Sequence, residues 1–348
     1  MSYARECIAR IGGYVPGEQP QGKPLVKLNT NENPYPPSPN VLKACGNFDA
    51  ARLRLYPEPS AKIIREAASK AFGIPMERII CGNGSDDLLT IALRTFVGEG
   101  QKLAYTDPSY SLYPVLADLQ GAQRQPVKLT ESFDFPDDAI EQASDATLFM
   151  LACPNAPTGN LFDKAKIEDV CKRFKGVVWI DEAYADFAER NCLDLVEKYP
   201  NVVVSRTLSK SFSLAGLRLG LAFANENLVI EMNKVRDSYN VDMITQYLAS
   251  AALEDIEYMR ANAKRICETR DWLSKELSMR GATVLPSSTN FIFVKPIRPA
   301  SEVFAELRKH GYLVRYFSIP IINQYIRITI GKREDMEGFL QAFDAVAK

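Results

Sequence analysis

The sequence of 348 residues contains a single histidine, His310, and this scarcity excludes several kinds of chemistry. A zinc site built from several histidines cannot form, and a serine or cysteine nucleophile activated by histidine would have to use this one residue. His310 precedes a glycine in "LRKHGYLV", a pattern typical of a helix end at the surface. We therefore expect no metal site, and catalysis by groups other than histidine.

Charge blocks and long apolar runs are also absent. The formal net charge is −1, and acidic and basic residues are mixed along the chain, which argues against a nucleic-acid partner. No apolar run approaches the roughly 20 residues that cross a bilayer, and the first residues lack the apolar core of a signal peptide. The seven cysteines are scattered without a CxxC pair. These features predict a cytoplasmic protein without disulfides or membrane contact.

Short apolar runs rich in β-branched residues alternate with helical patterns in the first two thirds of the chain. The runs are continuous, as in strands that are buried on both faces, so the sequence predicts an α/β fold with a mainly parallel sheet. The expected strands are 78–82, 102–106, 147–153, 177–181, 202–206 and 219–224, and the expected helices are Asp87–Phe96, Tyr110–Leu119, Lys164–Phe174 and Asn227–Val235.

A change of pattern near residue 245 predicts a second domain. A long helical pattern covers 246–280, and the strands after it have hairpin-like spacing, which indicates a smaller α+β domain over 246–348. The large domain is expected to cover 36–245. Residues 1–35 are rich in proline and glycine and poorly periodic, so we expect an arm that packs on another part of the molecule.

Three loops that follow predicted strands carry polar residues with more than one interpretation. In "RIICGNGSDD" a glycine turn leads into a helix near Ser85, which is either a phosphate site or an ordinary turn with an N-cap. "ACPNAPTGN" is a stiff turn that presents Asn155, or a turn with a structural function alone. In "VVWIDEAYADF", Asp181 either meets a buried cation or caps the next segment.

The stretch "SRTLSKSFSLAGLRLG" places Lys210 among hydroxyl groups. A lysine amine can form a Schiff base with a carbonyl, and Arg218 with the hydroxyls of Thr207 and Ser209 can hold a dianionic phosphate. An aspartate under a pyridinium nitrogen, here Asp181, completes the requirements of pyridoxal phosphate. Because the four motifs follow successive strands of one predicted sheet, we expect them to meet at its carboxyl edge.

The order of these motifs resembles that of the fold-type I pyridoxal-phosphate-dependent aminotransferases. "LNTNENPYPPSP", "LYPEPSAKIIREAASKAFGI", "VRYF" and "RITIG" are further similar to histidinol-phosphate aminotransferases, although Cys153 stands where that family often has asparagine. The motifs span nearly the whole chain. The resemblance implies a large domain with a mainly parallel seven-stranded sheet, a smaller α+β C-terminal domain, and a homodimer with active sites at the subunit interface. It also implies that the arm over residues 1–35 partly joins the small domain and the dimer interface.

The resemblance also implies roles for individual residues. Lys210 would carry the cofactor and move a proton at the substrate Cα, Asp181 would keep the ring nitrogen protonated, and Asn155 and Tyr184 would donate hydrogen bonds to the ring oxygen. The other implied cofactor-binding residues are Gly84, Ser85, Asp86, Tyr110, Thr207, Ser209, Arg218 and Tyr56, the last of which would reach the cofactor of the other subunit.

Substrate specificity is expected to depend on two arginines. Arg327 in "YIRITIG" and Arg315 in "YLVRYF" would hold an anion, with Tyr14 and Asn33 as further substrate-binding residues. Arg315 can also be a solvated surface charge, and Tyr14 a packing residue. The leading interpretation is amino transfer between histidinol phosphate and 2-oxoglutarate, giving glutamate. A threonine-phosphate decarboxylase and an aromatic aminotransferase are alternatives. A cofactor-binding regulatory module is disfavoured, because such modules carry a fused DNA-binding segment and this chain has neither the length nor the basic patch for one.

Overall fold

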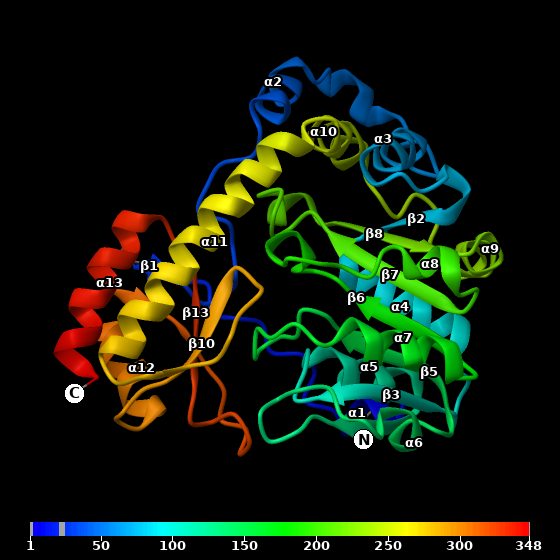
Figure 1. The fold of residues 1–348 in the computed structure, drawn as a ribbon. Coiled ribbons are helices and arrows are strands. Elements are labelled where there is room, and N and C mark those ends of the chain that lie inside the picture. The colour runs from blue at the N-terminus through cyan, green and yellow to red at the C-terminus, as the bar shows by residue number, and fades with distance from the viewer. Residues whose placement is uncertain (1–2, 21–24, 348) are drawn as a thin grey trace.

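A twisted sheet forms the centre of the larger part of the molecule in the computed structural model, which describes residues 3–20 and 25–347 (Figure 1). Its seven strands are β2 (Ile79–Asn83), β3 (Lys102–Asp107), β4 (Gln123–Lys128), β5 (Ala146–Ala152), β6 (Val177–Asp181), β7 (Val202–Thr207) and β8 (Leu219–Ala224). The strand order is β2-β8-β7-β6-β5-β3-β4, and the strands run in one direction except β8, which is antiparallel to β2 and β7 on either side of it. The prediction of a mainly parallel sheet is confirmed.

Helices cover both faces of this sheet. The helices of the larger part are α1 (Glu6–Ala9), α2 (Pro39–Asn47), α3 (Lys62–Phe72), α4 (Ser85–Phe96), α5 (Leu112–Gln120), α6 (Ala139–Gln142), α7 (Lys164–Arg173), α8 (Leu195–Lys198), α9 (Glu226–Val235) and α10 (Met243–Leu253). Short 3₁₀ turns occur at Ala50–Arg54, Met76–Arg78, Ala185–Phe187 and Ala215–Leu217. Because strand side chains alternate between faces, Trp179 packs with α4, α5 and α9, while Ile180 joins the main core on the other face.

The edge strand β4 was not among the strands expected from the sequence. Its sequence "QRQPVK" is mostly polar, and Val127 is its only fully buried residue. Pro126 cannot donate a ladder hydrogen bond, and an edge position tolerates this loss. A strand that buries so few side chains lacks the hydrophobic run by which strands are recognised in a sequence.

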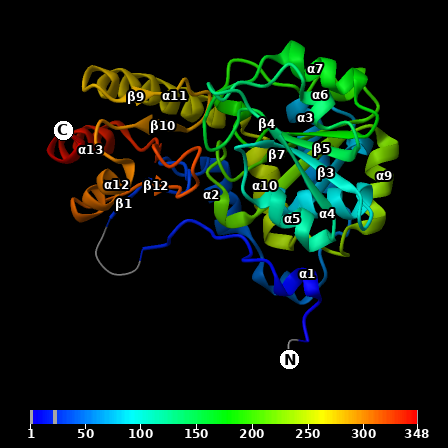
Figure 2. The same ribbon diagram turned by 90° about the horizontal axis from the view of Figure 1, so that it is seen from below.

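The smaller part contains a four-stranded antiparallel sheet of order β12-β13-β10-β9 (Figures 1 and 2). Its elements are the long helix α11 (Ile256–Met279), β9 (Thr283–Val284), β10 (Phe291–Lys295), α12 (Ala300–Lys309), β11 (Tyr312–Leu313), β12 (Arg315–Tyr316), β13 (Ile326–Thr329) and α13 (Arg333–Val346). α11, α12 and α13 pack around the sheet, which matches the α+β pattern expected for this region.

The helical pattern expected over 246–280 is two helices rather than one. α10 ends at Leu253 and α11 begins at Ile256, with Asp255 as its N-cap. α10 packs on α2 and α3 of the larger part, whereas α11 leaves toward the smaller part. The apolar pattern of the sequence continues from α10 into α11, so the break between the two helices could not be recognised from it. The domain boundary after residue 245 stays a prediction, since it falls inside α10.

The N-terminal segment connects the two parts. α1 lies beside α5, and β1 (Val26–Lys27) pairs in parallel with β11 of the smaller part (Figure 2). Residues 1–2 and 21–24 of the expected arm lie outside the described residues.

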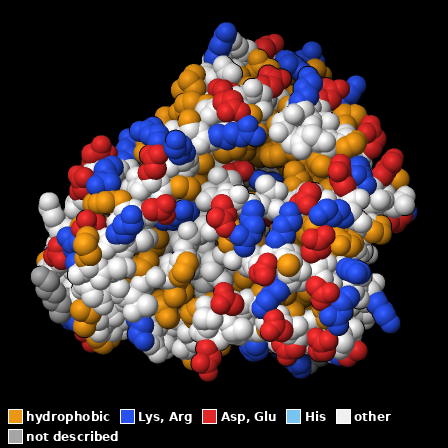
Figure 3. Space-filling view, in the orientation of Figure 1, with side chains coloured by type: hydrophobic (Ala, Val, Ile, Leu, Met, Phe, Trp, Pro, Cys, Tyr) orange, Lys and Arg blue, Asp and Glu red, His pale blue; other side chains and the backbone are white. Residues whose placement is uncertain are grey.

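Charged side chains of both signs are interspersed on the face seen in Figure 3. A search of the described helices finds none that combines the length and apolarity needed to cross a membrane.

Candidate active site

The ends of neighbouring strands bring most of the predicted residues to one edge of the large sheet. Asp181 ends β6 and Thr207 ends β7, and these strands are parallel neighbours. Asn155 follows β5, and Tyr110 follows β3. The antiparallel strand β8 begins at the same edge, directly after Arg218. This is the edge at which parallel sheets bind their ligands.

Gly84 forms a backbone turn that the guanidinium of Arg218 covers. Gly84 is the N-cap of α4 with φ +85°, and a Cβ atom there would lie 2.6 Å from Nη2 of Arg218. A Cβ atom on Gly220 of β8 would lie 2.7 Å from the backbone N of Ser85. Both positions therefore require glycine. No side chain of the described residues caps the first N–H groups of α4, so these groups and the helix dipole are available to an anion.

Hydroxyl groups and two charged side chains complete this turn. Thr207 Oγ1 donates to Ser209 Oγ at 3.0 Å, and Arg218 Nη1 donates to the same oxygen at 3.5 Å. Nη2 of Arg218 lies 3.6 Å from Oδ2 of Asp86. A helix start, two hydroxyls and a guanidinium together form a site suited to a phosphate dianion.

Asp181 is a buried carboxylate without a cationic partner among the described residues. Its side chain accepts hydrogen bonds from the phenol of Tyr113 at 3.1 Å and from the backbone N of Ala183 at 3.2 Å. Burial raises the pKa of Asp181 to about 6. The contact with Ala183 is the capping bond considered from the sequence, but it uses only one carboxylate oxygen. The uncompensated charge favours a cationic ligand above this strand end.

Lys210 lies partly buried, with its amine inside the chain rather than in solvent. Nζ donates to the carbonyl of Thr30 at 3.0 Å and lies 5.9 Å from the ring centroid of Tyr184. Burial, with the nearby charge of Arg327, lowers the pKa of Lys210 to about 8. The neutral amine, which is the nucleophilic form, is therefore a minority near neutral pH but far more abundant than for an ordinary lysine.

Asn33 holds the backbone of the loop that carries this lysine. Its Nδ2 donates to the carbonyls of Lys210 and Ser211 at 2.9 and 3.1 Å. These bonds position the lysine, and they differ from the substrate contact that the sequence predicted for Asn33.

The amide of Asn155 is fully engaged with its own loop and with the loop that follows β3. Nδ2 donates to the carbonyl of Pro108 at 3.0 Å and to Oγ1 of Thr158 at 2.7 Å, while Oδ1 accepts from Ser109 at 2.7 Å. Donation to a ligand would require Asn155 to give up one of these two donor bonds.

Tyr184 is buried and has one free donor. Its hydroxyl oxygen accepts from Nδ2 of Asn31 at 2.8 Å, and its ring packs edge-on against Phe291 with centroids 5.1 Å apart. Among the described residues, no acceptor receives the proton of this phenol. Burial raises the pKa of Tyr184, so the phenol stays protonated at neutral pH.

Tyr110 and Tyr14 contact each other at the mouth of this edge. Their rings meet edge-to-face with centroids 5.9 Å apart, and the hydroxyl of Tyr110 donates to Oδ1 of Asp86 at 3.0 Å. Tyr14 is exposed, and the N-terminal segment carries it to this position. The two tyrosines predicted from distant parts of the sequence are therefore neighbours.

The two predicted arginines stand directly opposite each other. Arg315 of β12 pairs in register with Arg327 of β13. Arg327 Nη2 donates to the carbonyl of Asn29 at 2.9 Å, while its buried Nε has no hydrogen-bond partner in the described part of the chain. Burial and the charge of Arg315 lower the pKa of Arg327.

Arg315 points its guanidinium toward the N-terminal segment. Its terminal nitrogens donate to the carbonyls of Val15 and Pro16 at 3.3 and 3.5 Å, and its Cζ lies 5.4 Å from the ring centroid of Phe317. Neither this arginine nor Arg327 meets a carboxylate within the described residues. Two paired guanidiniums without counter-ions suit a strongly anionic ligand.

Tyr56 lies apart from the other predicted residues within this chain. It is 80% exposed and stacks on Tyr239, with ring centroids 4.7 Å apart. Within one chain it therefore contributes nothing to the site.

Several residues that support the site were not identified from the sequence. Tyr113 holds Asp181, and its only sequence signal is its position one helical turn after Tyr110. A buried ion network also lies below the lysine loop: Arg206 pairs with Glu182 and Asp186, and Asp186 accepts from the hydroxyl of Ser211.

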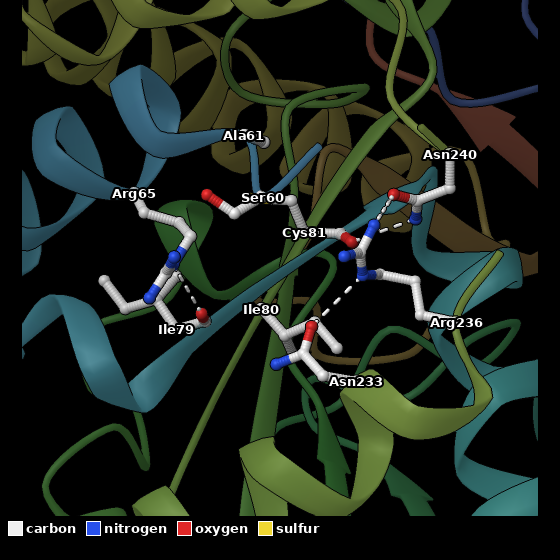
Figure 4. A pocket seen from close by; sticks show the side chains of 9 residues that line it. All are labelled: Ser60, Ala61, Arg65, Ile79, Ile80, Cys81, Asn233, Arg236 and Asn240. Carbon is white, nitrogen blue, oxygen red and sulfur yellow. Dashed lines mark hydrogen bonds between the residues drawn. The ribbon is translucent and has the colours of Figure 1, made fainter. Parts of the chain in front are cut away.

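A small cavity behind β2 is not an alternative site (Figure 4). Its volume of about 10 Å³ is no larger than one water molecule requires. Its two arginines are occupied, since Arg65 donates to backbone carbonyls and Arg236 to asparagine side chains. The lining residues are Ser60, Ala61, Arg65, Ile79, Ile80, Cys81, Asn233, Arg236 and Asn240.

Comparison with known sequences gives matches over almost the whole chain. Residues 23–343 match the model of the aminotransferase class I and II family. The chain is 46% identical over 340 residues to the histidinol-phosphate aminotransferase of Geobacter sp. strain M21, with 97% of both chains covered. It is 41% identical over 343 residues to the protein of the same name from Rippkaea orientalis, with 98% of both chains covered.

Solved structures share the fold. Histidinol-phosphate aminotransferase from Sinorhizobium meliloti, in complex with pyridoxal-5′-phosphate, superposes with a TM-score of 0.91 at 23% identity, covering 100% of this chain and 98% of that one. A mutant of Thermus thermophilus aspartate aminotransferase superposes with a TM-score of 0.83 at 20% identity, covering 99% and 100%. These likenesses confirm the predicted fold.

Proposed function

Because the chain belongs to the class I and II aminotransferases, we propose that it exchanges an amino group between histidinol phosphate and 2-oxoglutarate, giving imidazole-acetol phosphate and glutamate in histidine biosynthesis. It is a pyridoxal-phosphate-dependent aminotransferase. Relatives at 41–46% identity over nearly their full length are named for this substrate. The main structural observation in favour of this substrate is the pair of facing arginines, Arg315 and Arg327.

The residues at the sheet edge fit pyridoxal phosphate. The turn at Gly84 and Ser85, with Arg218, suits the phosphate, and the unpaired carboxylate of Asp181 suits a protonated pyridine nitrogen. When bound, the cofactor withdraws electrons from the α-carbon of the substrate. Thr207 and Ser209 would add hydroxyls to the phosphate site, and Asp86 would set the position of Arg218.

Lys210 is the proposed base. Its amine, with a pKa lowered to about 8, can attach the cofactor's aldehyde and can take up and return the proton of the substrate Cα. Asn33 keeps the backbone of this lysine in place through its two hydrogen bonds.

Asn155 and Tyr184 are the proposed donors to the ring oxygen of the cofactor. Tyr184 has its proton free for this bond, whereas Asn155 must exchange its contact with Pro108 or Thr158. Tyr110 would lie against the ring face, since it stands at the same edge after β3.

The arginine pair favours a phosphorylated substrate over a plain amino acid. One guanidinium is enough for a single carboxylate, whereas two opposed guanidiniums match a phosphate dianion. Arg327 would also hold the carboxylate of glutamate in the second half of the reaction. Tyr14, which is tied to Tyr110, would lie over the bound substrate.

The proposed assembly is a homodimer in which Tyr56 reaches the cofactor phosphate of the other subunit. An exposed apolar surface around Tyr56 supports this, since Tyr239, Leu53 and Leu55 are also exposed. Co-refolding Tyr56→Phe chains with Lys210→Ala chains should restore one intact site per heterodimer. A fully active monomer in sedimentation experiments would contradict the shared site.

The proposed compartment is the cytoplasm. Cys45, Cys81, Cys153, Cys171, Cys192 and Cys267 are free thiols, and thiols stay reduced in that compartment.

Half-reactions test the proposed substrate. The purified enzyme is first converted with glutamate, and each candidate oxo-acceptor is then added while the cofactor absorbance is followed. The spectrum of the aldehyde form should return fastest with imidazole-acetol phosphate, and histidinol phosphate should be a far better donor than histidinol or histidine.

Two outcomes would favour the alternatives. A preference for phenylalanine or tyrosine would indicate an aromatic aminotransferase. Release of carbon dioxide from phosphothreonine would indicate the decarboxylase.

A further inference from the structure

The segment 28–33 passes between the two parts of the molecule and touches several predicted site residues in turn. The carbonyl of Asn29 accepts from Arg327, and the carbonyl of Thr30 accepts from the amine of Lys210. This segment, called the strap below, therefore contacts both Arg327 and Lys210, although it has no regular secondary structure of its own.

Asn31 is the most firmly held residue of this segment. It is 1% exposed and adopts a left-handed backbone with φ +58°, a conformation that asparagine tolerates better than most residues. Its backbone N donates to Oγ1 of Thr329 at 3.0 Å, and the same hydroxyl donates back to its Oδ1 at 3.1 Å. Its carbonyl accepts from Asn290 at 3.0 Å. Three of its polar groups are thus fixed by the smaller part of the molecule.

The remaining polar group of Asn31 reaches into the larger part. Its Nδ2 donates to the hydroxyl oxygen of Tyr184 at 2.8 Å. A phenol has one proton to donate and accepts through its oxygen. Because the bond from Asn31 uses the oxygen as acceptor, the proton of Tyr184 must point elsewhere, and no acceptor for it exists among the described residues.

We propose that Asn31 is a positioning residue that aims the proton of Tyr184 at the ring oxygen of the cofactor. Thr329 fixes the amide of Asn31 by accepting from its backbone and donating to its Oδ1, so the amide can only present its N–H to Tyr184. This inference rests on the proposed function, in which Tyr184 donates to that oxygen. It adds a residue whose effect passes through another side chain.

Other charged or titratable groups also face Tyr184, and their effects must be distinguished from the effect of Asn31. Arg327 and Asp181 act on its hydroxyl electrostatically, Tyr14 lies nearby, and Nζ of Lys210 is 5.9 Å from its ring centroid. Substitutions at Asn31 leave these groups in place, so a change in the cofactor spectrum can be assigned to the lost amide.

The test is a pH titration of the visible absorbance of the bound cofactor in the holoenzyme. A donated hydrogen bond stabilises the negatively charged ring oxygen, so its loss should move the titration midpoint upward, by about 0.5–1 pH unit for one weakened bond. Asn31→Gly removes the side chain but keeps the left-handed backbone. Asn31→Asp presents a carboxylate that attracts the phenol proton, and its upward shift should be larger.

Matched variants provide the controls. Tyr184→Phe sets the largest possible shift, and Asn31→Gly added to Tyr184→Phe should produce no further shift. Asn227→Ala removes an exposed asparagine on α9 and should leave the midpoint unchanged. Thr329→Val keeps Asn31 but removes the hydroxyl that holds its amide, and it should cause a smaller upward shift. This variant keeps the test decisive if the Asn31 variants do not fold.

Two results would overturn the inference. A midpoint in Asn31→Gly or Thr329→Val equal to that of Asn227→Ala, with a clear shift in Tyr184→Phe, would make Asn31 purely structural. No shift in Tyr184→Phe would remove the contact on which the inference depends. Neither of these results depends on the substrate. If the titration shifts are as expected but the enzyme does not transaminate histidinol phosphate, the proposed function alone is contradicted.

Discussion

The cofactor end and the arginine end of the candidate site differ in which parts of the chain hold their polar side chains. At the cofactor end, Asp181 and Asn155 are fixed by hydrogen bonds within the larger part. At the arginine end, Arg315 and Arg327 contact backbone carbonyls of residues 15, 16 and 29, and neither meets a carboxylate among the described residues. The first region is ordered by one sheet, and the second by segments that lie far apart in the sequence.

We infer from this difference that the cofactor end provides the chemistry common to all substrates, and that the arginine end selects between substrates. A rigid set of strand ends can serve any amino acid that reaches the cofactor, because these groups address the cofactor itself. A guanidinium pair held only by carbonyls keeps its charge available for a ligand. We therefore expect changes at the cofactor end to affect all substrates equally, and changes at the arginine end to discriminate between them.

The largest effect is expected at the cofactor end, from Lys210→Ala. Loss of the base should lower kcat by about 10⁴-fold or more for every substrate while the variant still binds the cofactor. In the wild type, borohydride reduction followed by peptide mapping should place the cofactor on Lys210. Lys234→Ala, an exposed lysine on α9, is the control. A label on another lysine would end this assignment.

A somewhat smaller loss is expected from Asp181→Asn. An amide cannot hold a ring proton by charge, and breaking a buried charge pair costs about 3–5 kcal/mol, which corresponds to a loss of roughly 10²- to 5 × 10³-fold in kcat. The loss should again be equal for phosphorylated and plain substrates, with unchanged circular dichroism. Turnover close to wild type would mean that Asp181 serves only to cap the next segment through the backbone N of Ala183.

Arg315→Gln should separate the two ends most clearly. We expect a loss of about 2–4 kcal/mol in kcat/KM for histidinol phosphate and a much smaller loss for phenylalanine or tyrosine. Arg327→Gln should weaken both, because this arginine is also expected to hold a carboxylate. Equal losses for both substrates in Arg315→Gln would remove the distinction between the two ends.

The smallest predicted effect concerns stability without cofactor. Burial raises the pKa of Asp181 to about 6, above the roughly 3.9 of an unfolded chain, so its carboxylate is disfavoured in the folded state. The folded protein should therefore lose up to about 3 kcal/mol as the pH rises from about 4 to 6. Asp181→Asn removes this loss, and urea titrations of cofactor-free protein should show a stabilisation that grows from pH 5 to pH 8. A gain that shrinks with pH would contradict the shift.

The convergence of the cofactor-end residues at one sheet edge could be predicted from the sequence, for a physical reason. Asp181, Lys210 and Gly84 each follow a buried strand, and a hydrophobic run with a polar end is visible in one sequence. The carboxyl ends of parallel strands then meet without further information. The polar edge strand β4 and the break between α10 and α11 had no such signal, because burial is slight in the first and continuous through the second.

The supporting contacts could not be predicted because they join distant positions. Asn31 and Tyr184 are 153 positions apart, and Tyr113 and Asp181 are 68 apart. Each is an ordinary polar or aromatic residue in its local sequence. Their function arises only from the packing of the N-terminal segment and of α5 against strand ends.

The pairing of β1 with β11 has a consequence for protein engineering. Through this pairing, and through the bond from the backbone N of Thr329 to the carbonyl of Leu28, residues 26–31 are built into the smaller part although they precede most of the larger part in the chain. A chimera that exchanges residues 256–347 alone would join a foreign β11 and β13 to the original strap. Transplanting substrate preference between relatives should therefore require two inserts, the N-terminal one and the C-terminal one, exchanged together.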